Sequence, residues 1–415
     1  MAKTLIIDGN RNLKGEVKIS GSKNCALCLI AGALLCDEEV VLYDIPNIKD
    51  IVTFIKILNY LNVKTNFKDN VLSINAKDIK YRDLDIGDVG KFRASYYLIG
   101  ALINRFKHLK ISKFGGCSFT SRPINFHLNL LNHFGVNYTF DDGYEFNLDE
   151  AKEGEFTLPY PSFGASINGV LFALASQQEI TIRNVTPEVE FKHFIEFMKA
   201  IGGNIILNNN VVYIKKSKLH GTKFKNIPDR IESGTFLLMG PIICDYLKIN
   251  NINPEHNKPL LDLFSLLDID YELGDDYVII SKQEIKHSCF IETGLDEQIS
   301  SDLQPLLTVF CLNIPRISLI KEKVYTSRFT HIEPLRNMGG FVVQSNQNIL
   351  INGIMSLSGK EIIATDLRMA AAMVFACLCA EGQSIIHQCD YIDRGYETFT
   401  LKLNNLGADI KEYEN

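Results

Sequence analysis

Apolar, helix-like stretches recur along the chain at nearly one spacing. Each follows a polar or charged start, and the interval between starts is 64 to 72 residues. The starts lie near Ser22, Phe92, Phe163, Asp229, Ser301 and Thr365. The stretches read CALCLIAGALL, ASYYLIGALI, GVLFALA, GTFLLMGPII, LLTVFCL and MAAAMVFACL. Self-similarity at a fixed period is the signature of a repeated structural unit, so we predict six equivalent units.

Each unit continues in the same way after its apolar helix. A strand follows, then a second helix that often ends near a glycine, then one or two further strands. The strand segments are VVLYDI, KISKF, ITIRNV, LKINNI, RISLI and SIIHQC, and the glycines are Gly135, Gly202, Gly339 and Gly407. Six such units predict an α/β protein of two domains with three units each, divided near residues 226–228. The opening strands within residues 4–20 could pair with either half.

Composition narrows the class of protein. The 415 residues are 46% apolar and 22% charged, which is typical of a globular protein with two or three domains. The longest apolar run, residues 369–380, is too short to span a membrane. The N-terminal residues carry no apolar secretion signal, so we expect a cytoplasmic protein. The net charge of −6 argues against general nucleic-acid binding but leaves room for a basic pocket that holds a small anion.

The ten cysteines favour a reducing compartment. Most lie in apolar runs, where they read as buried thiols. Cys25 and Cys28 form a CxxC, but no partner follows at the spacing of a zinc site, so we expect no metal. Cys117 differs, because it lies in a Gly-Gly-Cys loop among polar residues.

The predicted helix starts carry several cations. Lys23, Arg93 and Arg368 stand at three of the six. Free N–H groups and the positive end of the helix dipole also lie at such starts, so several of them together would attract an anion. This pattern favours a phosphorylated or carboxylated ligand bound between two domains.

Several of these segments resemble the enolpyruvyl transferases. They are GEVKISGSKNCALCLIAGALL, FRASYYLIGALI, GGCSFTSRP, ATDLR and IDRGYE, in this order over nearly the whole chain. The resemblance is to the branch of that family that uses UDP-N-acetylglucosamine. It implies two inverse α/β barrels, each of three βαβαββ repeats, with the active site in the cleft between them. It also implies that residues 1–21 join residues 229–415 in one domain, while residues 22–228 form the other.

The resemblance assigns a phosphoenolpyruvate site. Lys23, with Asn24 beside it, Arg122 and Arg394 match residues that hold the phosphate, and Arg328 and Arg368 match those that hold the carboxylate. The planar guanidinium suits both anions. Cys117 matches the cysteine that protonates phosphoenolpyruvate and that fosfomycin alkylates in relatives. Asp302 matches the aspartate at the attacking sugar hydroxyl. It could also be the N-cap of the helix that begins with LQPLL, and both roles could hold together. Asp366 is expected to orient Arg394 or the reacting groups.

The resemblance also assigns a site for the uridine nucleotide. The residues that match it are Arg93, Arg122, Pro123, Ile124, Asn125, Phe126, Ser162, Phe163, Gly164, Asp302 and Val324. His127 is expected to be structural. Four departures from the family pattern fall on this side: Tyr160 replaces a lysine, Asn125 an aspartate, Phe163 a valine, and Thr326-Ser327 a Glu-Asn pair. The loss of a lysine removes a charged phosphate contact, so the acceptor is less certain than the reaction.

The expected reaction transfers the carboxyvinyl group of phosphoenolpyruvate to the 3′-hydroxyl of UDP-N-acetylglucosamine, the first committed step of peptidoglycan synthesis. No cofactor is implied, the partners are these two small molecules, and the sequence does not indicate an oligomeric state. One alternative keeps the chemistry but changes the acceptor to another nucleotide, such as UMP, in a specialised pathway. The other is a non-catalytic sensor of sugar nucleotides.

Overall fold

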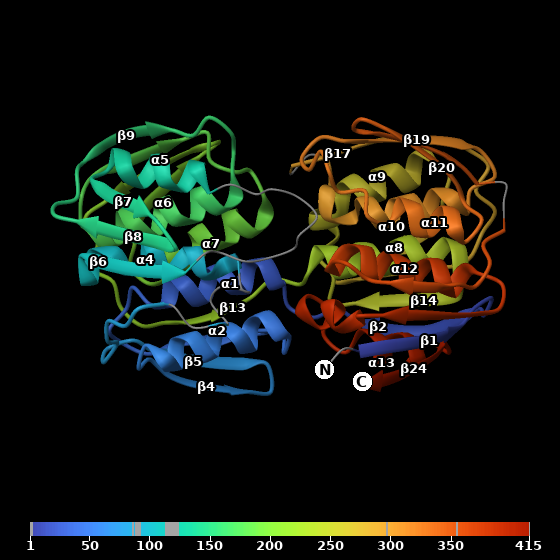
Figure 1. Cartoon of the computed structure of the whole chain (residues 1–415), viewed down its shortest axis with the longest axis horizontal. Helices are drawn as coiled ribbons and strands as arrows, with labels where there is room; N and C mark the ends of the chain where they lie inside the picture. Colours follow the sequence, from blue (N-terminus) through green and yellow to red (C-terminus); the bar gives the residue numbers. More distant parts are fainter. Residues whose placement is uncertain are drawn as a thin grey trace. The chain divides into compact units, whose positions relative to one another are not determined.

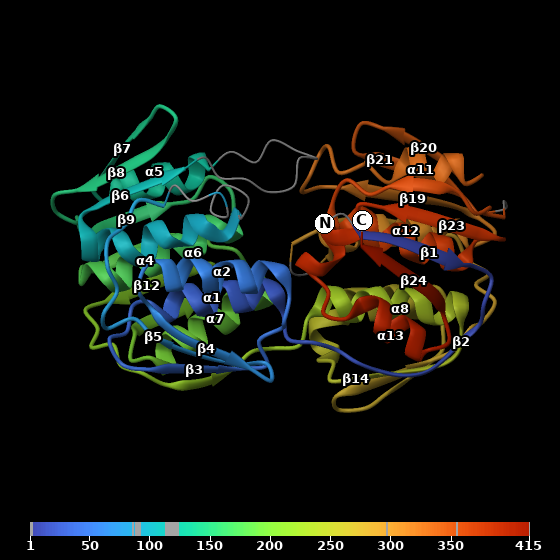
Figure 2. The same cartoon turned by 60° about the horizontal axis from the view of Figure 1, so that its bottom comes forward.

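The described residues of the computed structural model fall into two compact units (Figures 1 and 2). They are residues 3–84, 87, 93–112, 124–295, 298–353 and 356–414. We call residues 21–112 and 124–227 the N-terminal unit, and residues 3–20 with 228–414 the C-terminal unit.

Three helices pack together in the interior of the N-terminal unit, namely α1 (Lys23–Ala33), α4 (Tyr97–Phe106) and α6 (Phe163–Ser176). In α6, every residue from Gly164 to Leu174 is buried. A helix that is apolar on all sides must be buried on all sides, which places these helices inside the sheets. The other helices are η1 (Arg93–Tyr96), α2 (Lys49–Tyr60), α5 (Asn125–His133) and α7 (Val189–Ala200).

Three sheets carry the strands of the N-terminal unit. Their strand orders are β13-β3-β5-β4, β6-β8-β7 and β11-β12-β10-β9. The strands are β3 (Val40–Tyr43), β4 (Lys64–Lys68), β5 (Val71–Asn75), β6 (His108–Ser112), β7 (Val136–Phe140), β8 (Gly143–Leu148), β9 (Gly154–Thr157), β10 (Ile180–Arg183), β11 (Asn204–Asn208), β12 (Val211–Lys215) and β13 (Lys223–Lys225). The run β9-α6-β10-α7-β11-β12 is one complete βαβαββ unit, in which β9 and β10 are parallel and the remaining pairs antiparallel.

The C-terminal unit repeats this plan. Its interior helices are α8 (Arg230–Ile243), α10 (Gln304–Leu312) and α12 (Leu367–Cys379), and they too pack on one another. Its other helices are η2 (Pro254–Asn257), α9 (Lys258–Leu266), η3 (Ser301–Leu303), α11 (Ile332–Asn337), η4 (Cys389–Arg394) and α13 (Phe399–Asn405). Residues from every described interior helix of this unit join one hydrophobic core.

Three further sheets surround these helices. Their orders are β22-β23-β1-β24, β15-β16-β14-β2 and β18-β17-β19-β21-β20. The strands are β1 (Lys3–Asp8), β2 (Leu13–Lys18), β14 (Cys244–Asn250), β15 (Tyr271–Leu273), β16 (Tyr277–Ile280), β17 (Phe290–Gly294), β18 (Ile299–Ser300), β19 (Ile317–Glu322), β20 (Phe341–Ser345), β21 (Asn348–Asn352), β22 (Glu361–Ile363), β23 (Gln383–His387) and β24 (Asp409–Glu414).

The first two strands of the chain lie in the C-terminal unit, where they appear blue among yellow and red elements (Figure 2). β1 pairs antiparallel with β23 and β24, and β2 pairs parallel with β14. The N-terminal unit is completed in a similar way by a distant strand, because β13 pairs parallel with β3. β2 and β13 thus form the edges of their sheets, whereas β1 lies between β23 and β24.

The predicted repeat of helices and strands is confirmed by these elements. Each predicted apolar stretch forms an interior helix, and each predicted strand segment contains a strand. Four of the second helices end at the glycines singled out above, Gly135, Gly202, Gly339 and Gly407, whose φ angles lie between 92° and 102°. A residue with a Cβ is strained there, so glycine ends these helices at defined points.

Candidate functional site

The Asp302 carboxylate bridges two buried arginines within the C-terminal unit. Arg328 donates from Nη1 to Asp302 Oδ1 at 2.8 Å, and Arg368 donates from Nη2 to Oδ2 at 2.7 Å. The arginine side chains are 4% and 8% exposed, whereas the Asp302 side chain is 22% exposed. Of these three side chains, the carboxylate is therefore the most exposed.

Asp302 does not cap the helix that follows it. Asp302 lies inside the short helix η3, which is capped by the Ser300 hydroxyl through a hydrogen bond from Asp302 N at 3.3 Å. The helix that follows, α10, begins after Leu303 and has no side-chain cap. The Asp302 carboxylate is instead drawn to the two guanidiniums, which offer a full positive charge in place of a backbone dipole. The capping alternative raised from the sequence is thus wrong, while the presence of Asp302 among cations agrees with a role in chemistry.

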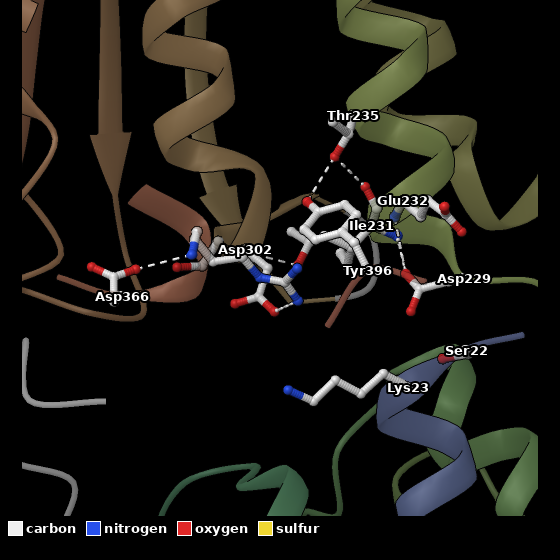
Figure 3. A network of polar contacts seen from close by, with 12 residues as sticks. Ser22, Lys23, Asp229, Ile231, Glu232, Thr235, Asp302, Asp366 and Tyr396 are labelled. Carbon is white, nitrogen blue, oxygen red and sulfur yellow. Dashed lines mark hydrogen bonds and ion pairs between the residues drawn. The ribbon is translucent and has the colours of Figure 1, made fainter. Parts of the chain in front are cut away.

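Arg368 is held in place by the start of α12 and by an aromatic ring. Its guanidinium lies 5.7 Å from the centre of the Tyr396 ring, and the Tyr396 hydroxyl is 2.9 Å from Thr235 Oγ1 in α8 (Figure 3). Burial by itself would lower the pKa of Arg368, but the Asp302 carboxylate outweighs it and raises this pKa above its usual value. Arg368 therefore stays charged although it is buried.

Asp366 caps α12. Its Oδ1 accepts from Arg368 N and Met369 N, both at 3.0 Å, and its Oδ2 accepts from Thr330 Oγ1 at 2.8 Å. The carboxylate thus fixes the backbone of Arg368 directly. Arg394, the expected partner of Asp366, is the last residue of η4 and is half-buried. Val324, another candidate of this unit, donates from its N–H to the Glu322 carboxylate at 2.8 Å.

In the N-terminal unit, Lys23 forms a short ion pair. Its Nζ lies 2.6 Å from Asp50 Oδ2, and the two side chains are 13% and 9% exposed. Lys23 is the first residue of α1, and Asp50 lies in the first turn of α2. Asn24 follows Lys23 and is half-buried, and its carbonyl accepts from Cys28 Sγ at 3.2 Å. The α1 start therefore presents a cation together with a helix dipole.

The remaining candidates of the N-terminal unit meet around His127. This buried ring lies 4.5 Å from the Tyr96 ring, and its Nδ1 is 2.9 Å from Asn168 Nδ2. Arg93 lies 5.7 Å from the Tyr96 ring centre. Burial, assisted by the positive charge of Arg93, lowers the pKa of His127 to about 3. The imidazole is therefore neutral, and its Nδ1 accepts from the Asn168 amide.

The turn from Ser162 to Gly164 packs against this group. Ser162 caps α6, with its hydroxyl 3.4 Å from Ala165 N. A Cβ on Gly164 would lie 2.7 Å from His127 Cε1 and 2.8 Å from the Tyr96 hydroxyl, closer than real contacts allow. Glycine lets the helix start approach His127 and Tyr96. Arg93 and the Ser162–Gly164 turn, matched separately from the sequence, are thus brought together.

Tyr160, one of the departures, stacks on Phe126. The ring centres are 6.2 Å apart and the planes differ by 20°. Tyr160 is 38% exposed, Phe126 and Phe163 are half-buried, Asn125 is exposed at the start of α5, and Ile124 is buried. An aromatic surface thus stands where the family carries a charge, and such a surface favours stacking over ion pairing.

Three candidates lie outside the described residues: Cys117, Arg122 and Pro123. The other nine cysteines are described, and eight of them are buried while Cys379 is half-buried. This agrees with the predicted apolar environments. Burial raises the pKa of Cys36, Cys244, Cys377 and Cys389 to about 12. These thiols are protonated at neutral pH and poorly reactive.

Sequence reasoning missed the partners of the predicted cations. Asp50 resembles an ordinary acid in the first turn of a helix, and Tyr96, Asn168 and Glu322 lie in apolar or strand segments. No local pattern links Lys23 to Asp50 or Val324 to Glu322. Within the described ranges, no group of three metal-ligating side chains and no helix long and apolar enough to cross a bilayer is found.

The profile of one protein family matches residues 7–403, and its description is EPSP synthase (3-phosphoshikimate 1-carboxyvinyltransferase). The chain belongs to this family. Curated relatives in the same size range include the UDP-N-acetylglucosamine 1-carboxyvinyltransferase of Kosmotoga olearia, which is 33% identical over 99% of both chains. UDP-N-acetylglucosamine 1-carboxyvinyltransferase 2 of Listeria monocytogenes is also 33% identical, over 99% of this chain and 98% of its own. These relatives are transferases, and the chain is a member of an enzyme family.

Solved structures confirm the predicted two-domain fold. The enolpyruvyl transferase NikO from Streptomyces tendae superposes with a TM-score of 0.91 at 21% identity and covers 99% of both chains. EPSP synthase from Acinetobacter baumannii gives a TM-score of 0.78 at 16% identity over the whole of both chains. At such identities the likeness establishes the fold of the family and nothing finer.

Proposed function

We propose that this enzyme transfers the carboxyvinyl group of phosphoenolpyruvate to the 3′-hydroxyl of UDP-N-acetylglucosamine and releases phosphate, as the first committed step of peptidoglycan synthesis. The names of relatives that are 33% identical over nearly full length support this acceptor. The observation that carries the proposal is the pair of buried arginines that both hold the Asp302 carboxylate.

This arrangement suits a carboxylate ligand. Arg328 and Arg368 offer two fixed guanidiniums to one carboxylate, at 2.8 and 2.7 Å. The carboxylate of phosphoenolpyruvate has the same shape and charge, so it could take over these donors from Asp302. Asp302 would then be released beside the bound substrate. There it could accept the proton of the attacking hydroxyl, which links substrate binding to activation of the acceptor.

The proposed reaction requires stabilisation of negative charge on phosphoenolpyruvate, and it implies no cofactor. The acceptor oxygen forms a bond to C2 of phosphoenolpyruvate while C3 gains a proton, for which we propose Cys117 as the donor. The resulting phospho-ketal then loses a proton from C3 and its bond to the phosphate oxygen, which gives the enol ether and inorganic phosphate. Lys23, Arg122 and Arg394 are proposed to hold the phosphate group throughout.

The N-terminal unit offers groups suited to the nucleotide. Ser162 and Gly164 begin an interior helix whose first N–H groups and dipole favour a diphosphate. Arg93 adds a positive charge near this helix start, because both lie against Tyr96 and His127. We propose that Asn125, Phe126 and Val324 contact the nucleotide or the sugar.

Phosphate release tests the proposal most directly. Purified enzyme would be given phosphoenolpyruvate with UDP-N-acetylglucosamine, UMP or shikimate 3-phosphate, and inorganic phosphate would be measured. We expect release with UDP-N-acetylglucosamine, and mass spectrometry should find the enol ether on the sugar. Release with UMP alone would replace the acceptor but keep the reaction. UMP is included because Tyr160, which stacks on Phe126, stands where the family resemblance expects a lysine near the diphosphate. An enzyme that binds nucleotide but releases no phosphate would be a sensor.

A further inference from the structure

Glu322 is a buried carboxylate to which no role has yet been assigned. It is the last residue of β19 and is fully buried, at 0% exposure. Its Oε1 accepts from Ser301 Oγ, Val324 N and Tyr325 N, each at 2.8 Å, and its Oε2 accepts from Thr293 Oγ1 at 2.8 Å. An ionised carboxylate has about four acceptor positions and no donor, so these four neutral donors suit it.

Two of these contacts, from Ser301 and Tyr325, lead toward the Asp302–Arg328 pair. Ser301 precedes Asp302, and its hydroxyl accepts from Arg328 Nη1 at 3.1 Å while it donates to Glu322. The backbone of Tyr325 binds Glu322, and the Tyr325 ring lies 4.2 Å from the Arg328 guanidinium carbon. Arg328 N also donates to Tyr325 O at 3.2 Å. Glu322 thus anchors both segments that carry the pair.

The contacts form a polarised chain from Arg328 through the Ser301 hydroxyl to Glu322. Each hydrogen bond in such a chain strengthens the next in a low-dielectric interior. The hydroxyl of Ser301 can accept from a cation well only while it donates its own hydrogen, and the negative Glu322 takes that hydrogen. A neutral group in place of Glu322 would weaken these hydrogen bonds but would still occupy the space of the side chain.

We propose that Glu322 is a positioning residue that sets the geometry of Arg328 and Asp302 for the carboxylate of phosphoenolpyruvate. The inference rests on the proposed function. It assigns Glu322 no contact with either substrate, because its side chain is enclosed by Ser301, Thr293 and the turn that starts at Val324. Loss of its charge should therefore impair phosphoenolpyruvate binding and leave the nucleotide side intact.

The test compares Glu322→Gln with wild type. The amide keeps the size of the side chain and one oxygen for the three contacts on Oε1, and its NH₂ group can donate to Thr293. We expect kcat/KM for phosphoenolpyruvate to fall about 10- to 100-fold, the cost of a small misplacement in a site. Most of the loss should be in the KM for phosphoenolpyruvate, while the KM for the nucleotide stays unchanged.

Two further variants separate positioning from simple support of the fold. Ser301→Ala removes the linking hydroxyl and keeps Glu322, so it should raise the KM for phosphoenolpyruvate in the same direction. Thr293→Val leaves the other oxygen of Glu322 without its donor, on the side away from Arg328, so it should lower the melting temperature but spare that KM. Equal kinetic losses in Thr293→Val and Glu322→Gln would overturn the proposal, as would an unchanged KM in Ser301→Ala.

Calorimetric binding of phosphoenolpyruvate keeps this test independent of turnover. Weaker binding in Glu322→Gln than in wild type supports the positioning role even if no acceptor yields phosphate, and in that case only the proposed reaction fails. Equal binding in the two proteins overturns the positioning role whatever the turnover. Should Glu322→Gln not fold, the same comparison is made between Ser301→Ala and Thr293→Val.

Discussion

The two units begin their interior helices with different chemistry. In the C-terminal unit, α8 and α12 are capped by the carboxylates of Asp229 and Asp366, each of which accepts from two backbone N–H groups at 2.8 to 3.0 Å. In the N-terminal unit, α1 and α6 are capped by the hydroxyls of Ser22 and Ser162, each with one contact at 3.4 Å. In the C-terminal unit a full negative charge thus lies at the positive end of the helix dipole, whereas in the N-terminal unit a neutral group lies there.

This difference indicates how each unit can bind an anion. Where carboxylates already neutralise the helix starts, positive charge must come from side chains, and Arg328 and Arg368 supply it. Where the caps are neutral, the backbone itself retains positive potential for a phosphate. We therefore assign carboxylate recognition to guanidiniums in the C-terminal unit and diphosphate recognition to a helix start in the N-terminal unit.

The largest effect is expected at the carboxylate that bridges the arginines. Asp302→Asn should lower kcat about 10²- to 10⁴-fold, the usual contribution of a general base. Phosphoenolpyruvate should bind at least as tightly, because the amide competes less well for Arg328 and Arg368. Turnover assays measure kcat, and calorimetry measures the affinity for phosphoenolpyruvate. The matched variant in the other unit is Asp50→Asn, which removes the partner of Lys23 and should cost turnover much less. Near-normal turnover in Asp302→Asn would exclude the general-base role.

Both units contain a buried, neutral histidine next to a candidate cation. Burial, helped by Arg93 for His127 and by Arg328 for His331, lowers the pKa of each to about 3. The unfolded chain binds a proton below pH about 6.5 and the folded chain does not, so stability falls as the pH drops from about 6.5 to about 3. Each histidine should remove about 1.4 kcal/mol of unfolding free energy per pH unit over this window.

Urea unfolding at pH 7.5, 6.5, 5.5 and 4.5 checks this. The difference between wild type and His127→Gln should shrink as the pH falls, and the same holds for His331→Gln. The double variant should show the sum of the two changes, because the histidines lie in different units. A difference that does not depend on pH would mean that the pKa of the histidine is the same in the folded and the unfolded chain.

Loss of the Asp366 cap should lower the free energy of unfolding more than loss of the Ser162 cap. The Ser162 change should be the one that weakens nucleotide binding. Asp366→Ala should cost about 1 to 2 kcal/mol of unfolding free energy, because two backbone N–H groups and the Thr330 hydroxyl lose their acceptor. Ser162→Ala should cost less, about 0.5 kcal/mol, but it should weaken binding of UDP-N-acetylglucosamine. Denaturant titration and calorimetry measure both, with Asp366→Asn as the control that keeps a capping oxygen. A stability loss at Ser162 as large as that at Asp366 would contradict the comparison.

The smallest effect is expected at Tyr160. Tyr160→Lys restores a charge near the proposed diphosphate, and we expect UDP-N-acetylglucosamine to bind a few-fold more tightly. The gain is limited because the position is 38% exposed and because the stack on Phe126 is lost. Tyr160→Phe, which keeps the ring, is the control and should bind as wild type. Unchanged or weaker binding in Tyr160→Lys would mean that other groups already satisfy the diphosphate.

The six-unit repeat could be predicted because it shows in the order of apolar and polar residues over short stretches of the sequence. Interior helices such as α6 and α12 are apolar on every side, and the glycines at positions 135 and 407 end helices at positive φ. The cations Lys23, Arg328 and Arg368 were found because they lie in short motifs. Their ion pairs could not be predicted, because the partner of Lys23 is 27 positions away and the two arginines that hold Asp302 are 26 and 66 positions away.

The amino-acid sequence by itself determined the six units, the family and the candidate cations, since periodicity and motifs act over a few residues. The family resemblance implied that the opening strands join the C-terminal half, but only the tertiary structure decided their partners, which are β23 and β24 for β1 and β14 for β2. It alone decided that Asp302 bridges two arginines and that Glu322 anchors the segments beside them. These contacts join residues that are far apart in the sequence and close in space. A charged side chain acquires a fixed partner only when packing excludes water from it and brings the opposite charge beside it.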